Sequence, residues 1–83
     1  MKFRKYAEIK KIFLYNLFAL CDDSGMSMNY IAKQTGTHAN NLNKYRYHGK
    51  SISEDKIFNM AKQLKLPQEK IFTAQKYEAA EKN

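Results

Sequence analysis

A chain of 83 residues is long enough for one domain, and its 43% hydrophobic and 13% aromatic content predicts a globular fold rather than disorder. Cys21 is the only cysteine, which excludes a disulfide within the chain and a zinc site with two or more thiolates. Fifteen Lys and Arg against eight Asp and Glu give a formal net charge of +7, which favours an anionic partner.

The first predicted element is a helix over residues 6–21. Its apolar residues recur every three or four positions, as on one face of an amphipathic helix: Ile9, Phe13, Leu17 and Leu20. The DDSG run that follows predicts a turn, in which Gly25 takes the left-handed conformation that ends a helix. Ser27 is then expected to cap a second, short helix over residues 28–34.

The second helix is expected to stop at a turn centred on Gly36, because glycine adopts a positive φ without strain. Thr37 is placed to cap a third helix over residues 38–47. Two short helices joined by such a turn form the arrangement in which the second helix can enter a DNA major groove. Four residues are expected to pack these helices together and against the core: Ile31, Ala32, Leu42 and Tyr45.

A fourth helix is expected after Ser51 or Ser53, either of which could cap it, with acidic residues in its first turn. Pro67 should end this helix and open a short fifth one, with Ile71 and Phe72 facing inwards. No strand-like alternation and no internal repeat compete with this interpretation. The predicted fold is therefore all-α, a compact five-helix bundle. Five aromatic residues are assigned to its core: Tyr6, Phe13, Phe18, Phe58 and Phe72.

The segment 28–72 resembles the Cro and phage-repressor class of helix-turn-helix proteins, the xenobiotic-response-element family. The resemblance is carried by Ile31-Ala32-Lys33, Gly36, Leu42, Gly49 and the string KIFNMAKQLKLPQEKIF. It implies a lambda-repressor-like bundle in which residues 1–72 form a DNA-binding domain, with the helix-turn-helix at 28–47. The polar tail, residues 73–83, is expected to fray.

The chain departs from the family pattern in three places. Met28 stands where the family usually has a glutamine that contacts phosphate, Thr35 and Thr37 replace apolar residues around the turn, and Gly49 comes one residue late.

The resemblance also implies which residues meet DNA. Six are expected at the base edges: His38, Ala39, Asn40, Asn43, Lys44 and Tyr47. Asparagine can pair with an adenine edge through one donor and one acceptor, so an A·T-rich half-site is expected. Seven are expected at the phosphates: Met28, Asn29, Tyr30, Lys33, Asn41, Arg46 and Lys50.

The charge distribution agrees with this placement, because no acidic residue occurs between Asp23 and Glu54. A second basic cluster near the start of the chain is opposed only by Glu8: Lys2, Arg4, Lys5, Lys10 and Lys11. A solvated, lysine-rich surface with no partner would give the same composition.

Other functional classes find little support in the sequence. It contains no glycine-rich phosphate loop, no paired catalytic carboxylates and no nucleophile elbow. Cys21 is expected to be a buried thiol, and neither His38 nor His48 has a partner at metal-ligand spacing. We therefore expect no enzymatic activity, no cofactor and no metal.

The longest apolar stretch, residues 12–21, is too short to span a bilayer, and the basic start of the chain lacks the features of a signal peptide. A cytoplasmic protein without a membrane partner is expected.

The leading hypothesis is a homodimeric transcriptional repressor whose two recognition helices enter successive major grooves of a palindromic operator, about 34 Å apart. An antitoxin-like interaction subunit that also binds DNA is one alternative. Another is a DNA-architectural or excision accessory factor of a mobile element, for which the basic N-terminal arm is the supporting feature.

Overall fold

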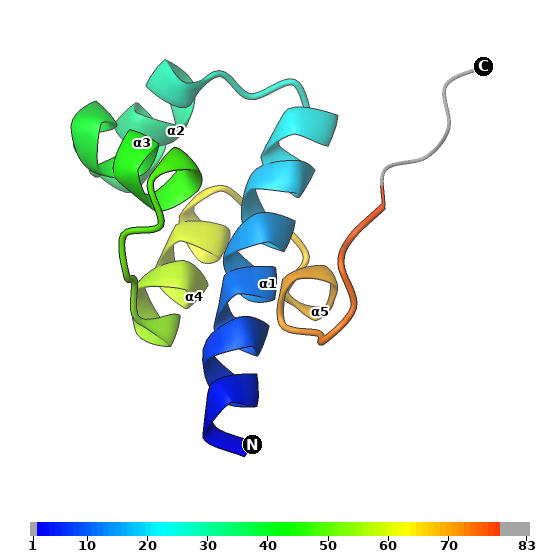
Figure 1. The fold of residues 1–83 in the computed structure, drawn as a ribbon. Helices are drawn as coiled ribbons and strands as arrows, with labels where there is room; N and C mark the ends of the chain where they lie inside the picture. The colour runs from blue at the N-terminus through cyan, green and yellow to red at the C-terminus, as the bar shows by residue number, and fades with distance from the viewer. Residues whose placement is uncertain (1, 79–83) are drawn as a thin grey trace.

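Five helices make up the regular structure of residues 2–78, the part of the chain that the computed structural model describes, with side chains from Glu8 onwards (Figure 1). They are α1 (Lys2–Asp23), α2 (Met28–Thr35), α3 (Ala39–Tyr47), α4 (Glu54–Gln63) and α5 (Gln68–Ile71). The prediction of a compact, all-α fold with five helices is confirmed. Three of the predictions fall outside the described part of the structure. They concern the side chain of Tyr6, the basic side chains of Lys2, Arg4 and Lys5, and the tail residues 79–83.

α1 is longer than the predicted 6–21 at both ends: it begins at Lys2, and Asp22 and Asp23 continue the helix instead of starting a turn. The helix ends where Gly25 takes a φ of 77°. There the N–H of Met26 donates to the carbonyl of Cys21 (2.9 Å), and the N–H of Gly25 donates to that of Asp22 (3.0 Å). These two bonds satisfy the last carbonyls of the helix, and they confirm the predicted left-handed glycine.

Serine side chains fix the starts of α2 and α4. The hydroxyl of Ser27 accepts a hydrogen bond from the backbone N–H of Tyr30 (3.1 Å), and that of Ser53 accepts one from Lys56 (3.1 Å). Each bond satisfies a backbone donor that has no partner within its helix. Both predicted caps are confirmed, with Ser53 rather than Ser51 capping α4.

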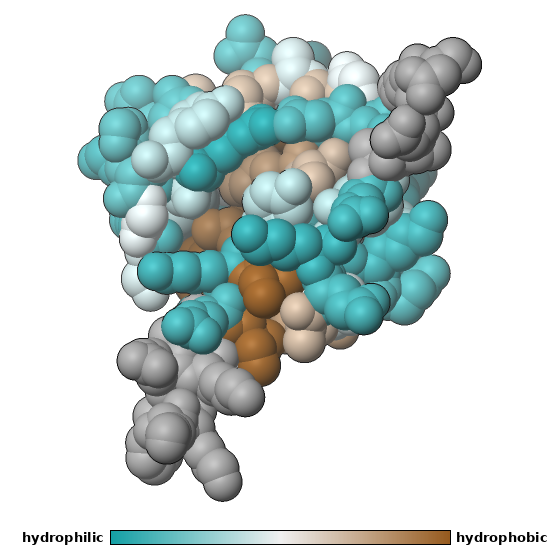
Figure 2. All heavy atoms as spheres, turned by 45° about the vertical axis from the view of Figure 1, so that its right-hand side comes forward, coloured by the Kyte–Doolittle hydropathy of each residue, from teal (hydrophilic) through white to brown (hydrophobic). Residues whose placement is uncertain are grey.

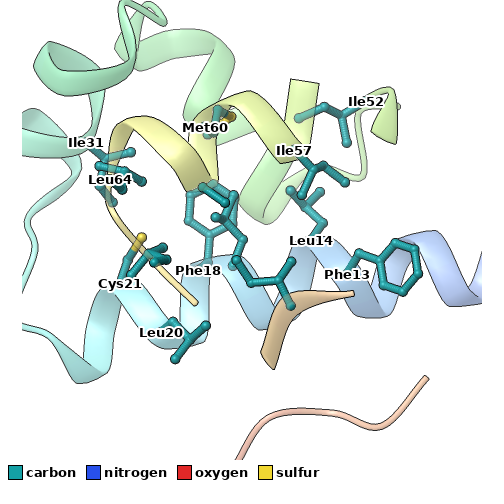
Figure 3. Close-up of a cluster of buried hydrophobic side chains, with 14 of the residues drawn as sticks. Phe13, Leu14, Phe18, Leu20, Cys21, Ile31, Ile52, Ile57, Met60 and Leu64 are labelled. Atoms are coloured by element: carbon teal, nitrogen blue, oxygen red, sulfur yellow. The ribbon is translucent and has the colours of Figure 1, made fainter. Parts of the chain in front are cut away.

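The core lies where α1 crosses the other helices. α1 packs against α3, α4 and α5. Figure 3 shows Leu14, Phe18 and Cys21 on the side of α1 that faces Ile57, Met60 and Leu64. The largest apolar side chains that are completely buried are Leu17, Ile31, Leu42, Ile57, Met60 and Ile71.

The predicted core position is confirmed for some of the aromatic residues and not for others. Phe13 and Phe18 are buried, and Phe72 is half-buried, with its ring 5.1 Å from that of Phe13. The predicted core position of Phe58 is wrong, because 44% of its surface is exposed. It directly follows the buried Ile57 on α4, and adjacent residues of a helix point in different directions.

Cys21 is completely buried, as predicted. Burial raises the pKa of its thiol from 9.0 to about 11, with a smaller contribution from the neighbouring Asp22 carboxylate. The thiol is therefore neutral near pH 7 and serves as a small core residue. Within residues 2–78, no helix has both the length and the apolar character needed to cross a membrane.

Asn16 is buried in the middle of α1 and holds the segment that follows α5. Its Nδ2 donates to the carbonyls of Ile71 and Gln75 (3.1 Å each), and its Oδ1 accepts from the N–H of Tyr77 (2.6 Å). The Tyr77 hydroxyl also donates to Asp23 (2.7 Å). The expected fraying after residue 72 is therefore wrong for residues 73–77. The buried side-chain amide of Asn16 forms hydrogen bonds with the backbone of this segment.

Replacing Asn16 by alanine should lower the free energy of unfolding by about 2 to 4 kcal/mol, because buried backbone groups lose their partners and a small cavity remains. Urea denaturation measures the loss, and hydrogen exchange should show faster exchange of the Tyr77 amide. Asn59→Ala, at an exposed position of α4, is the control and should change stability by about 0.5 kcal/mol or less. Equal effects of the two changes would show that Asn16 does not anchor this segment.

Candidate nucleic-acid interface

The connection between α2 and α3 is built on Gly36, whose φ is 69°. Its N–H donates to the carbonyl of Ala32 (2.9 Å), which closes the end of α2. A Cβ built at this glycine would meet nothing within 4 Å, so the requirement for glycine comes from the backbone conformation and not from crowding. The predicted positive φ is confirmed, and it lets the chain reverse between two short helices.

Two threonines lie on the inner side of this turn. Thr35 is buried, and its hydroxyl donates to the carbonyl of Ile31 (2.8 Å) and accepts from the N–H of Thr37 (3.3 Å). These are positions where the resemblance implies apolar residues. The hydrogen bonds show how a polar side chain at Thr35 is accommodated there.

Thr37 does not cap α3, contrary to prediction, because its side chain is buried beneath the turn. The N-cap is His38, whose Nδ1 accepts a hydrogen bond from the backbone N–H of Asn40 (3.1 Å). The accepting nitrogen carries no proton in this arrangement. His38 therefore fixes the start of α3, besides being a predicted base-reading residue.

α3 presents one polar face to solvent. Leu42 is completely buried on its inner side and Tyr45 is half-buried, as predicted, whereas four residues spaced by three and four positions are exposed: Asn40, Asn43, Lys44 and Tyr47. This spacing places them on one side of a helix. His38 is exposed beside this face and Ala39 is half-buried. The structure thus brings the six predicted base-reading residues together on one short helix and its cap.

The side chains of Asn40, Asn43 and Lys44 make no hydrogen bond or ion pair within the described part of the chain. Their donors and acceptors are therefore free to meet a ligand. Tyr47 is 64% exposed, and its ring contacts the Arg46 guanidinium (5.3 Å).

The predicted phosphate contacts divide into two groups. Asn29, Tyr30, Lys33 and Lys50 are exposed, while Met28, Asn41 and Arg46 are half-buried. Lys50 lies beside α3, where its Nζ donates to the Asn41 side chain (3.2 Å) and sits 5.6 Å from the centre of the Tyr45 ring.

Arg46 braces α3 against the two preceding helices. Its guanidinium forms an ion pair with Asp22 at the end of α1, lies over the Phe18 ring (5.2 Å), and contacts the sulfur of Met28 in α2 (3.5 Å). Its side chain is only 19% exposed, compared with 53% for Asp22. In this arrangement the guanidinium faces a carboxylate of the same chain and not the solvent.

Asp22 is the residue of this region that sequence reasoning missed. An aspartate in an expected turn gave no signal of a partner 24 positions away, because the pairing depends on how α3 crosses α1. Neither α2 nor α3 carries an acidic residue in its first turn. The N-terminal end of α3 therefore keeps the positive potential of its free N–H groups.

Arg46→Ala should lower the free energy of unfolding by about 1 to 3 kcal/mol, because it removes packing on Phe18 as well as a partly buried ion pair. Lys44→Ala, on the exposed face of the same helix, should change it by about 0.5 kcal/mol or less. Thermal or urea unfolding compares the two variants. A larger loss from Lys44→Ala would contradict the bracing role of Arg46.

No group of three or more His, Cys, Asp or Glu side chains is arranged to hold a metal ion among residues 8–78. Comparison with protein families, with curated proteins and with solved structures found no match to this chain.

Proposed function

We propose that the protein binds double-stranded DNA sequence-specifically and acts as a transcriptional repressor, with α2 and α3 as a helix-turn-helix of the Cro and phage-repressor type. The observation that carries the proposal is the exposed face of α3, where Asn40, Asn43 and Lys44 present unpaired polar groups. A nine-residue helix with such a face matches the size and chemistry of a major-groove reader.

The roles within this interface follow from the position of each side chain. Asn40 lies in the first turn of α3, the part of a recognition helix that reaches base edges, and its amide can pair with adenine. Lys33 is exposed in the last turn of α2 and is suited to a phosphate. Arg46 is a weaker candidate for a phosphate contact, since DNA would have to compete with Asp22.

Binding is tested by selecting sites from random duplexes and then titrating the selected site at several salt concentrations. We expect an enriched sequence with dyad symmetry and an affinity that falls steeply with salt. Asn40→Ala should lose about 1 to 3 kcal/mol on the selected site and little on random DNA, whereas Lys33→Ala should weaken binding to both. Asn59→Ala, on α4, is the matched control and should bind as the parent does. No enriched sequence together with a flat salt response would overturn the proposal.

The same proposal requires two copies of the chain, because a single small module contacts too few bases for tight specific binding. The exposed side chain of Phe58 offers an apolar contact for the second copy. It is an exposed phenylalanine on α4, with its ring 6.3 Å from that of the half-buried Phe72. Figure 2 shows apolar residues reaching the surface between hydrophilic ones on the side of the molecule that carries α5. We place the dimer contact around Phe58 and Phe72.

Phe58→Glu should weaken dimerisation by about 2 kcal/mol or more, roughly thirtyfold in Kd, because a charge replaces an apolar anchor. Its position on the surface leaves the fold intact, and Gln63→Glu on the same helix controls for the added charge. Sedimentation equilibrium should find a dimeric parent, a dimeric control and a monomeric Phe58→Glu variant. A parent that remains monomeric at all concentrations would rule out this surface.

A further inference from the structure

A hollow of about 640 Å³ lies between α1 and the segment that runs from the end of α3 to Ile52. Its lining is mostly apolar and includes Leu14 and Phe18 of α1 together with Ile52. Sites for small organic molecules usually occupy roughly 300 to 1,000 Å³ and have mostly apolar walls. In size and in lining, the hollow therefore resembles a small-molecule site.

Three tyrosines also line the hollow. Tyr15 comes from α1, and Tyr45 and Tyr47 come from α3. Tyr15 is 49% exposed and Tyr45 is half-buried, so their rings are accessible beside the buried aliphatic residues. Aromatic rings of this kind bind the apolar body of a ligand and leave a hydroxyl for a polar group.

The charged groups of the hollow are mainly cationic. Lys10, Lys11, Arg46 and Lys50 line it, and Asp22 is the acidic residue among its lining. Asp22 is paired with Arg46, so its charge is largely compensated within the protein. Lys11 and Lys50 are exposed at its rim. A positive rim beside an apolar interior is complementary to a molecule with an apolar body and one negative group.

We infer that this hollow binds a small organic acid, with its hydrocarbon or aromatic body against Leu14, Phe18 and Ile52 and its carboxylate near Lys11 and Lys50. The Nζ of Lys50 already donates to Asn41 (3.2 Å), and an ammonium group has two further donors for a carboxylate.

Such a ligand would also affect α3, a consequence that rests on the function proposed above. Tyr45, Arg46 and Tyr47 form the last part of the helix whose first turns carry Asn40 and Asn43. Tyr47 and Lys50 belong both to the hollow and to the predicted DNA interface. A bound carboxylate would compete with phosphate for Lys50 and cover Tyr47. The acid should therefore weaken DNA binding, and DNA should weaken binding of the acid by the same factor.

Binding is measured without DNA by NMR titration of the isotope-labelled chain. The probe is 6-phenylhexanoate, compared with its neutral amide and with 6-phenylhexylamine. We expect the acid to shift the amides of Tyr15, Tyr45 and Ile52 and to bind at least about tenfold more tightly than the neutral amide, with the amine weakest. Equal affinities for the three compounds, or shifts confined to other residues, would overturn the inference.

Two variants locate the site. Ala19→Trp places a large ring in the hollow and should abolish binding, and Lys11→Glu should weaken it about tenfold or more. Lys62→Glu, on α4 and outside the hollow, has the same net charge as Lys11→Glu and should bind as the parent does. If Lys11→Glu and Lys62→Glu weakened binding of the acid equally, the loss would come from the net charge of the protein. That result would contradict a local site at the hollow.

The regulatory step is tested separately on the selected DNA site. Saturating 6-phenylhexanoate should raise the Kd for DNA by about tenfold at constant ionic strength. Unchanged DNA affinity in the presence of bound acid would overturn the proposed effect of the acid on DNA binding. The acid-binding site itself would still be supported by the NMR titration without DNA. Failure of the protein to bind any DNA would overturn the proposed function and leave that titration unaffected.

Discussion

Burial of Leu42 is the contact on which the candidate interface depends. α3 has nine residues, and Leu42 is the one that the structure buries completely. Because a helix turns by a fixed angle per residue, fixing Leu42 on the inner side places Asn40, Asn43 and Lys44 on the outer side. A helix this short has little stability of its own and keeps its place through tertiary packing. The orientation of the polar face of α3 therefore depends on the packing of Leu42 in the core.

Arg46 is the second constraint on α3, and it changes the electrostatic interpretation of this region. The sequence between Asp23 and Glu54 contains no acidic residue, which suggests uninterrupted positive charge. In the folded chain, the end of α1 brings Asp22 against Arg46. One cation is thereby used to join helices, while Lys44 stays exposed on the outer face of α3 and Lys50 stays exposed at the rim of the neighbouring hollow.

The features that the sequence predicted correctly are local. A serine cap acts on a backbone N–H three residues away, and Gly25 and Gly36 adopt positive φ at their own positions, so neighbouring residues suffice to recognise them. The errors concern contacts between distant segments. Threonine before a helix predicts a cap at Thr37, and an aromatic residue at helical spacing predicts a core position for Phe58. The direction of each side chain depends instead on tertiary packing, which buries Thr37 and leaves Phe58 exposed. The hollow depends on how α1 lies against α3, and helical periodicity contains no such information.

The hydrogen bonds between Asn16 and the segment from Ile71 to Tyr77 have a consequence for folding during synthesis. α1 is synthesised first, yet the carbonyls and the N–H that satisfy its buried amide lie 55 to 61 positions further on. Until those residues have left the ribosome, this side of α1 has no protein partner and must stay hydrated. The full set of Asn16 hydrogen bonds can therefore form only after residue 77 has emerged, so α1 reaches its native surroundings together with the segment that follows α5 and not on its own.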